Sequence, residues 1–187
     1  VTQRSVEFML DYRLVKKGAP EAVHVDCSVT YRGVATSTIT GLSHMEGKQV
    51  SVCSDGANHP DKTVSGGAVT LDGPATLAHV GYSFPSRLQT MRIEIQGPAG
   101  TAQTATKGIA SVGLRLQSTI GGRIGPSFDK MDEIKTLNPL VPVGTPPPLK
   151  NGDVPITFPS GVNTDGAVCY EQPYPLPATI VAMVIKV

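Results

Sequence analysis

The 187-residue sequence contains no tryptophan, and aromatic residues make up only 5% of it. Glycan-binding surfaces usually present clusters of exposed tryptophan or tyrosine, because these rings join a large apolar face to a polar group. Here Tyr170 and Tyr174 lie among prolines instead. The composition therefore disfavours a sugar-binding surface.

The sequence also lacks a charge excess of either sign. Its 16 basic residues are balanced by 15 acidic ones, for a formal net charge of +1. Nucleic-acid-binding domains usually carry a basic excess, so the whole chain does not have their electrostatic signature. A nearly neutral chain also repels its own copies only weakly, which permits self-association.

Long apolar runs and cysteine motifs are missing as well. The longest apolar run, Ala178 to Ile185, is interrupted by Thr179 and is too short to span a bilayer as a helix. The three cysteines, Cys27, Cys53 and Cys169, form no CxxC motif. We expect small buried thiols in a protein assembled in a reducing cytoplasm.

No catalytic or metal-binding motif is present. The four histidines, His24, His44, His59 and His79, show neither HxH nor HExxH spacing. No glycine-rich stretch has a GxSxG elbow or a Walker lysine. We therefore expect no catalytic, cofactor-binding or metal-binding residues, no cofactor, and a protein that is not an enzyme. His44 and His59 are expected to form hydrogen bonds with turn backbone.

What the sequence does contain is turn-forming and alternating residues. It has 20 glycines and 16 prolines, spread without a period. Together with apolar residues at every second position, they indicate an all-β chain. We predict an antiparallel β-sandwich or barrel-like module with long Gly/Pro-rich loops.

Several segments alternate as strands do. In Ile109–Gln117 we expect Val112, Leu114 and Leu116 to point inward. The last segment is nearly continuous in apolar residues and predicts a buried strand. The predicted strands outside the central run described next are Ser5–Leu14, Val23–Tyr31, Thr36–Thr40, Leu88–Ile95, Ile109–Gln117, Val154–Phe158, Ala167–Glu171 and Ile180–Val187.

The run from Gly41 to Tyr82 is dense in strand and turn signals. Asp55-Gly56 is suited to a primed two-residue hairpin turn. We expect Pro60 to end that turn and Thr63-Val64 to start another strand, which predicts four short strands up to Tyr82. Their period-2 positions include Val69, Leu71, Ala78 and Val80.

Residues 121–150 predict an irregular Gly/Pro-rich loop region, and residues 97–106 a candidate boundary inside the module. Within the loop region, Phe128–Leu137 fits either one helical turn or a loop. Its acidic residues, Asp129, Asp132 and Glu133, fit a solvated or interface loop, or the carboxylate pair of a glycoside hydrolase.

The order of residues in the central run resembles a known family. The resemblance continues downstream through the GGRIGPSFDKMDEI segment and the final Gln172-Pro173 region. The chain resembles the C-terminal region of the tail nozzle proteins (tail tubular protein B) and packaged-DNA stabilisation proteins of short-tailed bacteriophages. The matching residues of the central run are Gly41, Leu42, His44, Glu46, Gly47, Val50, Asp55, Gly56, His59, Pro60, Thr63, Val64, Gly67, Val69, Leu71, His79, Val80 and Gly81.

The resemblance implies a structural virion protein. Residues 1–187 would be the C-terminal β module of a longer tail protein, assembled in the host cytoplasm as part of a six-fold ring. That ring would contact other tail or adaptor proteins, extend or close the tail channel, and help retain and eject packaged DNA.

Some basic side chains of such a module would face the lumen and touch the backbone of passing double-stranded DNA without reading its sequence. The candidates here are Lys107, Arg115, Arg123 and Lys130. Relatives are often densely basic just before the Ile109 strand, whereas this chain reads Thr104-Ala105-Thr106-Lys107.

Two other functions remain open from the sequence. One is a virion-borne module that binds a glycan or receptor through the same β scaffold. The other is a virion-associated glycan hydrolase, which would use the acidic residues near position 130.

Overall fold

The computed structural model describes residues 19–94, 96–97, 100–101, 105–135, 147–158 and 164–186. The described chain is all-β, with antiparallel sheets, two short 3-10 turns and no α-helix. It divides into two compact units. The first contains the described residues before Pro85 together with Pro147, Pro148 and Tyr174–Pro177, and the second contains the others. None of the described residues forms a helix long and apolar enough to cross a membrane.

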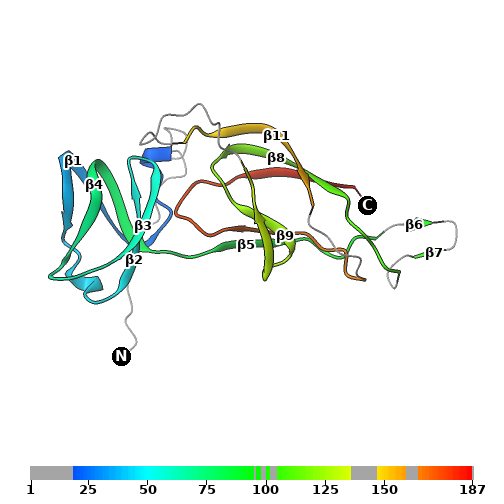
Figure 1. Ribbon diagram of the computed structural model, residues 1–187, viewed down its shortest axis with the longest axis horizontal. Coiled ribbons are helices and arrows are strands. Elements are labelled where there is room, and N and C mark those ends of the chain that lie inside the picture. Colours follow the sequence, from blue (N-terminus) through cyan, green and yellow to red (C-terminus); the bar gives the residue numbers. More distant parts are fainter. Residues whose placement is uncertain are drawn as a thin grey trace. The chain divides into compact units, whose positions relative to one another are not determined.

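One four-stranded antiparallel sheet builds the first unit, in the order β1-β4-β2-β3 (Figure 1). A 3-10 turn, η2, precedes it, and a second, η3, joins β1 to β2. The bounds are η2 Ala19–Glu21, β1 Asp26–Thr40, η3 Ser43–Met45, β2 Gln49–Ser54, β3 Ala57–Thr63 and β4 Ala68–Tyr82.

The two 15-residue strands β1 and β4 bend, because their pairing register shifts between Arg32 and Thr38. The bend lets β3 approach the first half of β4, where the Asp72 N–H donates a hydrogen bond to His59 Nε2 at 2.9 Å. The sheet thus curls around an apolar core in a barrel-like way. That core comprises Ile39, Leu42, Met45, Val50, Val52, Val64, Val69, Leu71, Ala75, Ala78 and Val80.

The predicted hairpin at Asp55-Gly56 is confirmed. Both residues have positive φ, 48° and 83°, as a type I′ turn requires, and Ser54 pairs with Ala57 across it. The strand after the turn begins at once, so Pro60 lies inside β3 instead of ending the turn. The run up to Tyr82 therefore holds three strands and not four.

The structure also merges two predicted strands at the start of this unit. The segment Val23–Tyr31, from Asp26 onward, and the segment Thr36–Thr40 belong to the single strand β1, whose pairing register shifts between Arg32 and Thr38. The predicted strand Ser5–Leu14 lies outside the described residues.

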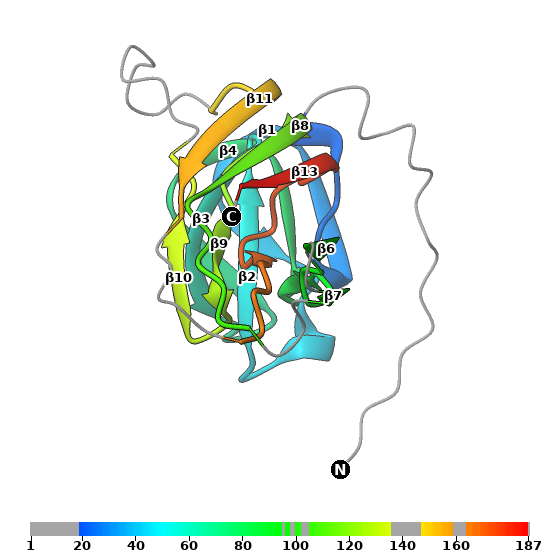
Figure 2. The ribbon, with the colours of Figure 1, turned by 90° about the vertical axis from the view of Figure 1, so that its right-hand side faces the viewer.

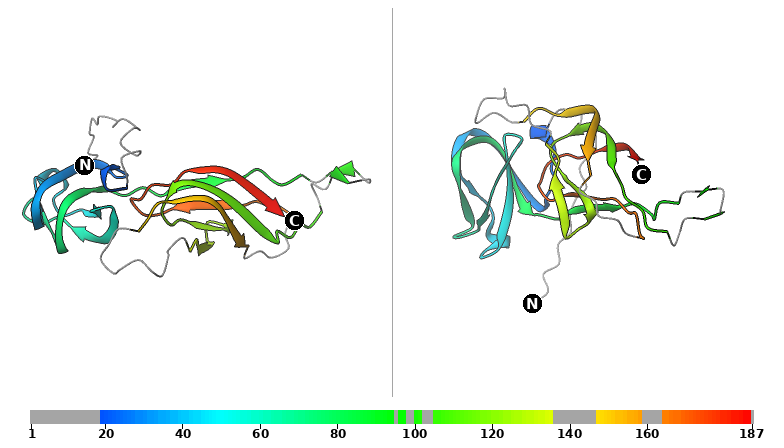
Figure 3. Two further views of the ribbon diagram at one scale, coloured as in Figure 1. Left: turned by 90° about the horizontal axis from the view of Figure 1, so that it is seen from above. Right: turned by 45° about the vertical axis from the view of Figure 1, so that its right-hand side comes forward.

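Two sheets and a small hairpin make up the second unit. One sheet has the order β10-β9-β12-β5, and the other has the order β11-β8-β13 (Figure 2). In the left view of Figure 3 the red strand β13 runs beside the green strand β8. The bounds are β5 Ser86–Gln89, β6 Gln96–Gly97, β7 Gly100–Thr101, β8 Ser111–Thr119, β9 Arg123–Ser127, β10 Lys130–Glu133, β11 Lys150–Thr157, β12 Cys169–Gln172 and β13 Ile180–Lys186.

The two sheets of this unit form a β-sandwich, because residues of both meet in one apolar core. Val112, Leu114 and Leu116 of β8 are buried, which confirms the predicted inward face of that strand. Ile124 of β9 and Tyr170 of β12 come from the other sheet. The remaining buried members are Ile109, Ile134, Phe158 and Val168.

Three expectations about the second unit are corrected. The loop region predicted at 121–150 contains β9 and β10, and Phe128 starts a turn between them and not a helix. Gly125 allows this hairpin, because a Cβ there would lie 1.9 Å from the Lys130 carbonyl oxygen. The strand predicted at Leu88–Ile95 ends at Gln89. The chain passes into the second unit at Pro85, and not near residues 97–106.

The C-terminal strand was expected to be buried and is not. Among the described residues, β13 pairs only with β8 and so forms one edge of its sheet. Ile180, Met183 and Ile185 pack against the core, whereas Val181 and Val184 are 57% and 60% exposed. The apolar residues of this segment are nearly continuous because both faces of this edge strand are apolar.

Candidate functional site

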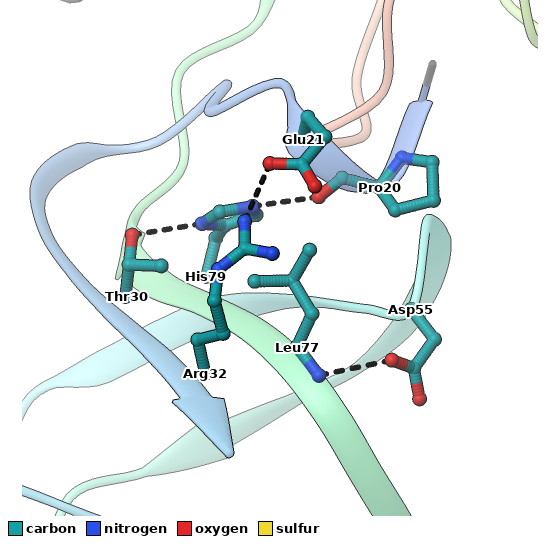
Figure 4. Close-up of polar contacts among 7 residues, drawn as sticks. All are labelled: Pro20, Glu21, Thr30, Arg32, Asp55, Leu77 and His79. Carbon is teal, nitrogen blue, oxygen red and sulfur yellow. Dashed lines mark hydrogen bonds and ion pairs between the residues drawn. The ribbon is translucent and has the colours of Figure 1, made fainter. Parts of the chain in front are cut away.

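The first unit carries an open surface cleft of about 450 Å³ between η2 and the sheet. Its walls come from η2, the middle of β1, the hairpin turn between β2 and β3, and the central part of β4 (Figure 4). The lining residues are Pro20, Glu21, Arg32, Gly33, Asp55, Thr76 and Leu77.

His79 lies beneath this cleft on β4 and is only 3% exposed. Its Nε2 donates a hydrogen bond to the Pro20 carbonyl at 2.8 Å, so its Nδ1 accepts one from the Thr30 hydroxyl at 2.9 Å (Figure 4). Burial lowers the pKa of His79, although the Pro20 carbonyl and Glu21 act in the opposite direction. The ring is therefore neutral at pH 7, with both nitrogens occupied.

An ion pair crosses the cleft in front of His79. Arg32 on β1 donates through Nη2 to the Glu21 carboxylate, and this hydrogen bond and charge raise the pKa of Arg32. The two side chains keep 61% and 29% of their surface exposed. Because solvent screens a pair with this exposure, it adds little to the stability of the unit and mainly fixes the position of η2 beside β1.

Asp55 forms the third wall through its turn position. Its carboxylate accepts a hydrogen bond from the Leu77 N–H at 2.9 Å (Figure 4). It also accepts one from the Thr76 hydroxyl at 2.8 Å. The Thr76 N–H lies 3.2 Å from the same group. Asp55 thus links the β2–β3 turn to β4. These hydrogen bonds occupy most of the acceptor positions of its carboxylate.

The polar groups of the cleft hold protein segments together. The Thr30 hydroxyl donates to His79 Nδ1 and His79 Nε2 donates to the Pro20 carbonyl, so both ring nitrogens bind groups of the protein. What the cleft offers to another molecule is the outer face of the Arg32 guanidinium. Its chemistry is therefore that of a contact surface.

Other residues of the central run have similar roles. The Glu46 carboxylate accepts hydrogen bonds from the N–H groups of Gly66 and Gly67 at 2.9 and 2.7 Å, which closes the turn before β4. His59 Nδ1 donates to the Pro60 carbonyl, and His44 Nε2 lies 3.3 Å from the Cys27 carbonyl. His44 and His59 do contact backbone carbonyls, as predicted, but these carbonyls belong to strands β1 and β3 and not to turns.

A row of alternating charges crosses the four-stranded sheet of the second unit. Glu133 on β10 pairs in register with Arg123 on β9, Arg123 with Glu171 on β12, and Glu171 with Arg87 on β5. Arg87 Nε donates to Glu171 at 2.7 Å and its guanidinium stacks 4.9 Å above the ring of Phe128. Glu171 is 7% exposed, so Arg87 neutralises a buried carboxylate.

The four basic residues proposed to meet DNA lie in the second unit but are not brought together as an open basic patch. Lys107 is 4% exposed, and its ammonium lies 3.4 Å from the Thr164 carbonyl, so it is buried inside the unit. Arg115 forms a two-bond pair with Asp153 at 2.8 and 3.0 Å, which lowers the pKa of Asp153. Arg123 pairs with Glu133, and Lys130 is exposed.

The acidic residues near position 130 are not arranged as a catalytic pair. Asp132 and Glu133 are consecutive in β10, so their side chains point to opposite faces. Glu133 is bound to Arg123, and Asp129 lies in the turn before β10. Within the described ranges, no three His, Cys, Asp or Glu side chains are grouped so that they could hold a metal ion.

Sequence reasoning missed the contacts of His79 and the pair of Arg87 with Glu171. His79 and Pro20 are 59 residues apart, and Arg87 and Glu171 are 84 apart. No local pattern connects such residues. The one usable signal was the alternation of charged and apolar residues in the segments that became β9 and β12.

No protein-family model and no curated protein sequence matches the chain.

Proposed function

We propose that this chain is a structural module of a bacteriophage tail nozzle. It takes its place in a six-fold ring that extends or closes the tail channel, contacts other tail or adaptor proteins, and helps retain and eject packaged DNA. Its location is then the virion tail. The proposal rests on the sequence resemblance and on what the resembling residues do in the fold.

The observation that carries the proposal is the structural role of those residues. Asp55, Glu46 and His59 each bind backbone N–H groups at turns or between strands. Gly41, Gly47, Gly56 and Gly67 all have positive φ, which glycine adopts without strain. The resembling residues thus form turns and link strands, as the residues of a structural scaffold do. This favours a mechanical role over a catalytic one.

Strand β13 supplies a surface suited to self-association. Its exposed Val181 and Val184 stand on an edge with no proline and only Lys186 as a charge. The other edge of the same sheet, β11, carries Asp153 and Pro155, which discourage strand addition. An unprotected edge on one side only suits the heterologous contacts from which rings are built.

The paired charges suit a surface past which DNA moves. Arg115 and Arg123 are already neutralised by carboxylates, so they attract phosphates weakly. Of the two exposed candidates, Arg115 is held by Asp153, and Lys130 would provide a non-specific contact. Weak, sequence-independent attraction would hold DNA in a channel without arresting its passage.

The ring is tested by native mass spectrometry and negative-stain imaging of the protein, with and without Val184→Lys. We expect a six-fold ring with a central channel for the wild type, and smaller species for the variant. Val34→Lys is the matched control, because Val34 is 86% exposed in the other unit and its change should leave the ring intact.

A monomer, or a compact trimer without a channel, would contradict the nozzle proposal and favour a receptor-binding module. Loss of the ring in Val34→Lys as well as in Val184→Lys would contradict the specific role of β13.

The DNA contact is tested by the salt dependence of binding to double-stranded DNA of mixed sequence. Lys130→Ala should reduce the slope of log K against log salt by about 0.9, the value for one lost phosphate contact. Lys62→Ala, a control in the first unit where Lys62 is paired with Asp72, should leave the slope unchanged. An unchanged slope for Lys130→Ala would remove Lys130 from the DNA contact.

A further inference from the structure

The segment from Pro20 to Val25, here called the strap, covers the face of β4 that points away from the core of the first unit. Ala78 and Val80 of β4 belong to that core, so Leu77, His79 and Gly81 point to the other face. All three are nevertheless buried, Leu77 to 6% exposure and His79 to 3%. The strap supplies the cover.

The strap forms a second, thin apolar layer on this face. Ala22 and Val25 are 2% and 6% exposed. Cys53, the register partner of His79 on β2, is 2% exposed, and burial raises its pKa to about 11. None of these three residues belongs to the main core of the unit. The layer is therefore small, and the strap contributes Ala22 and Val25 to it.

Close packing fixes the path of the strap at two glycines. A Cβ on Gly81 would lie 2.4 Å from the Asp26 carbonyl oxygen and 3.0 Å from Val25. A Cβ on Gly56 would lie 2.9 Å from the Pro20 ring. Immediately after the strap, Cys27 has a φ of 51°, a strained left-handed conformation at which the chain turns into β1. Because the chain bends at the end of the strap, the strap can move as a single segment about that bend.

Two polar contacts of the strap are the bond from His79 Nε2 to the Pro20 carbonyl and the exposed pair of Glu21 with Arg32. His24, inside the strap, has a buried Nε2 with no hydrogen-bond partner, and His79 acts on it through its charge. The strap thus closes over two neighbouring imidazoles, both of which must stay uncharged.

We propose that the strap Pro20–Val25 is a releasable cover, which opens when His24 and His79 take up protons and which exposes the Cys53 face of β4. In the closed state one imidazolium would face the other across the strap. Opening places both rings in water and removes the repulsion.

The other charged groups around the two rings do not compensate a double positive charge. Glu21 from the strap is already bound to Arg32 of β1, whose own positive charge opposes protonation of His79. Asp55 at the β2–β3 turn accepts bonds from Thr76 and Leu77 of β4. Cys53 on β2 stays a neutral thiol because of its raised pKa.

The direction of the pH effect follows from linkage. Burial lowers the pKa of His24 and of His79 below the ordinary value of 6.5, so the open state binds more protons than the closed state as the pH falls below 6.5. With two such groups, the opening equilibrium constant rises by up to about 100-fold per pH unit in that window. The part of the closure free energy that depends on these two histidines is fully present above pH 6.5 and declines below it.

Thiol labelling measures the opening directly. The protein is treated at pH 7.5 and pH 5.0 with a disulfide reagent that reacts in acid, and labelled peptides are counted by mass spectrometry. Cys169, fully buried in the second unit, is the internal control, because the ratio of Cys53 to Cys169 labelling cancels the reagent's own pH dependence. We expect the ratio to rise at least 10-fold at pH 5.0.

The variant His24→Gln/His79→Gln should abolish that rise. A glutamine amide at position 79 keeps a donor for Pro20 and an acceptor for Thr30 but does not titrate in this range. The matched control His59→Gln removes a histidine of the same unit whose bonding partners, Pro60 and Asp72, are not part of the strap, and it should keep the rise. A ratio that does not change with pH in the wild type, or that rises equally in the double variant, overturns the proposal.

Hydrogen exchange on the unaltered protein provides a test that needs no variant. At pH 5.0 the amides of residues 21–25 should lose protection relative to pH 7.5, after correction for intrinsic rates, while the amides of Val52 and Val80 keep theirs. Unchanged protection of the strap overturns the proposal. Equal loss of protection in β2 and β4 overturns it too, because the unit would then unfold as a whole.

Discussion

The two units of this chain use polar side chains in different ways. In the first unit, Glu46, Asp55 and His59 bind backbone groups at turns and between strands. In the second, Arg87 and Arg115 bind carboxylates on neighbouring strands. The first unit has one curled sheet, whose tight turns expose many backbone N–H groups, whereas the second has two sheets that bury a shared core.

This difference shows which sequence features specify each unit. The first unit depends on particular residues at particular turns, because each backbone donor needs its own acceptor. The second unit depends on apolar residues at alternate positions, a pattern that many sequences can supply. Most of its charged side chains lie on its surface. Substitutions of turn residues should therefore destabilise the first unit most, and substitutions of buried apolar residues should destabilise the second unit most.

The largest effect is expected from the core of the second unit. Leu114→Ala removes a fully buried side chain at the centre of the sandwich and should lower the free energy of unfolding by about 3–5 kcal/mol. Chemical denaturation of the purified protein measures it. Leu88→Ala, at a leucine that is 44% exposed on β5, is the control and should cost far less. Similar losses for both would mean that the shared core does not hold the unit.

The next effect tests the turn chemistry of the first unit. Asp55→Ala removes the acceptor for Thr76 and Leu77 and places alanine at positive φ, for an expected loss of roughly 2–4 kcal/mol. Asp55→Asn keeps an acceptor and tolerates that φ, so it should cost less than half as much. Equal stability of the two variants, measured by denaturant titration, would show that the turn does not depend on this acceptor.

A smaller effect compares two carboxylates of the second unit. Glu171→Gln uncouples a buried carboxylate from Arg87 and should cost about 1–3 kcal/mol. Asp153→Asn changes a carboxylate that is 64% exposed in its pair with Arg115, and it should cost less than Glu171→Gln because solvent screens an exposed pair. If Asp153→Asn lowered the thermal unfolding temperature more than Glu171→Gln, burial would not explain how much each ion pair contributes to stability.

The smallest effect is a response to acid that only the first unit should show. All four histidines lie in that unit, and His24 and His79 have pKa values lowered by burial. Their stabilisation is complete above pH 6.5 and falls below it, by at most about 1.4 kcal/mol per histidine and pH unit. Hydrogen exchange at pH 7.0 and 5.5 should show weaker protection of the amides of residues 21–25 at the lower pH and unchanged protection of β8. Equal weakening of both segments would remove the histidines as its cause.

The sequence predicted well wherever the signal was local. The hairpin at Asp55-Gly56, the inward face of Val112, Leu114 and Leu116, and the backbone contacts of His44 and His59 were all foreseeable, because each depends on residues close in the chain or on strict alternation. The sequence did not predict the hairpin of β9 and β10, because Gly125 and Pro126 are typical of loops. The reason for a glycine at position 125, its close approach to the Lys130 carbonyl, is visible only in the structure.

By itself the sequence determined the all-β class, the primed turn and the period-2 faces, since these follow from backbone sterics and side-chain alternation. Only the tertiary structure decided which basic residues are paired or buried, as Lys107 and Arg115 are, and that β13 is an edge. It alone placed the strap over His79, 59 residues from Pro20. Such contacts join segments far apart in the chain, and their energies depend on burial, which no local pattern records.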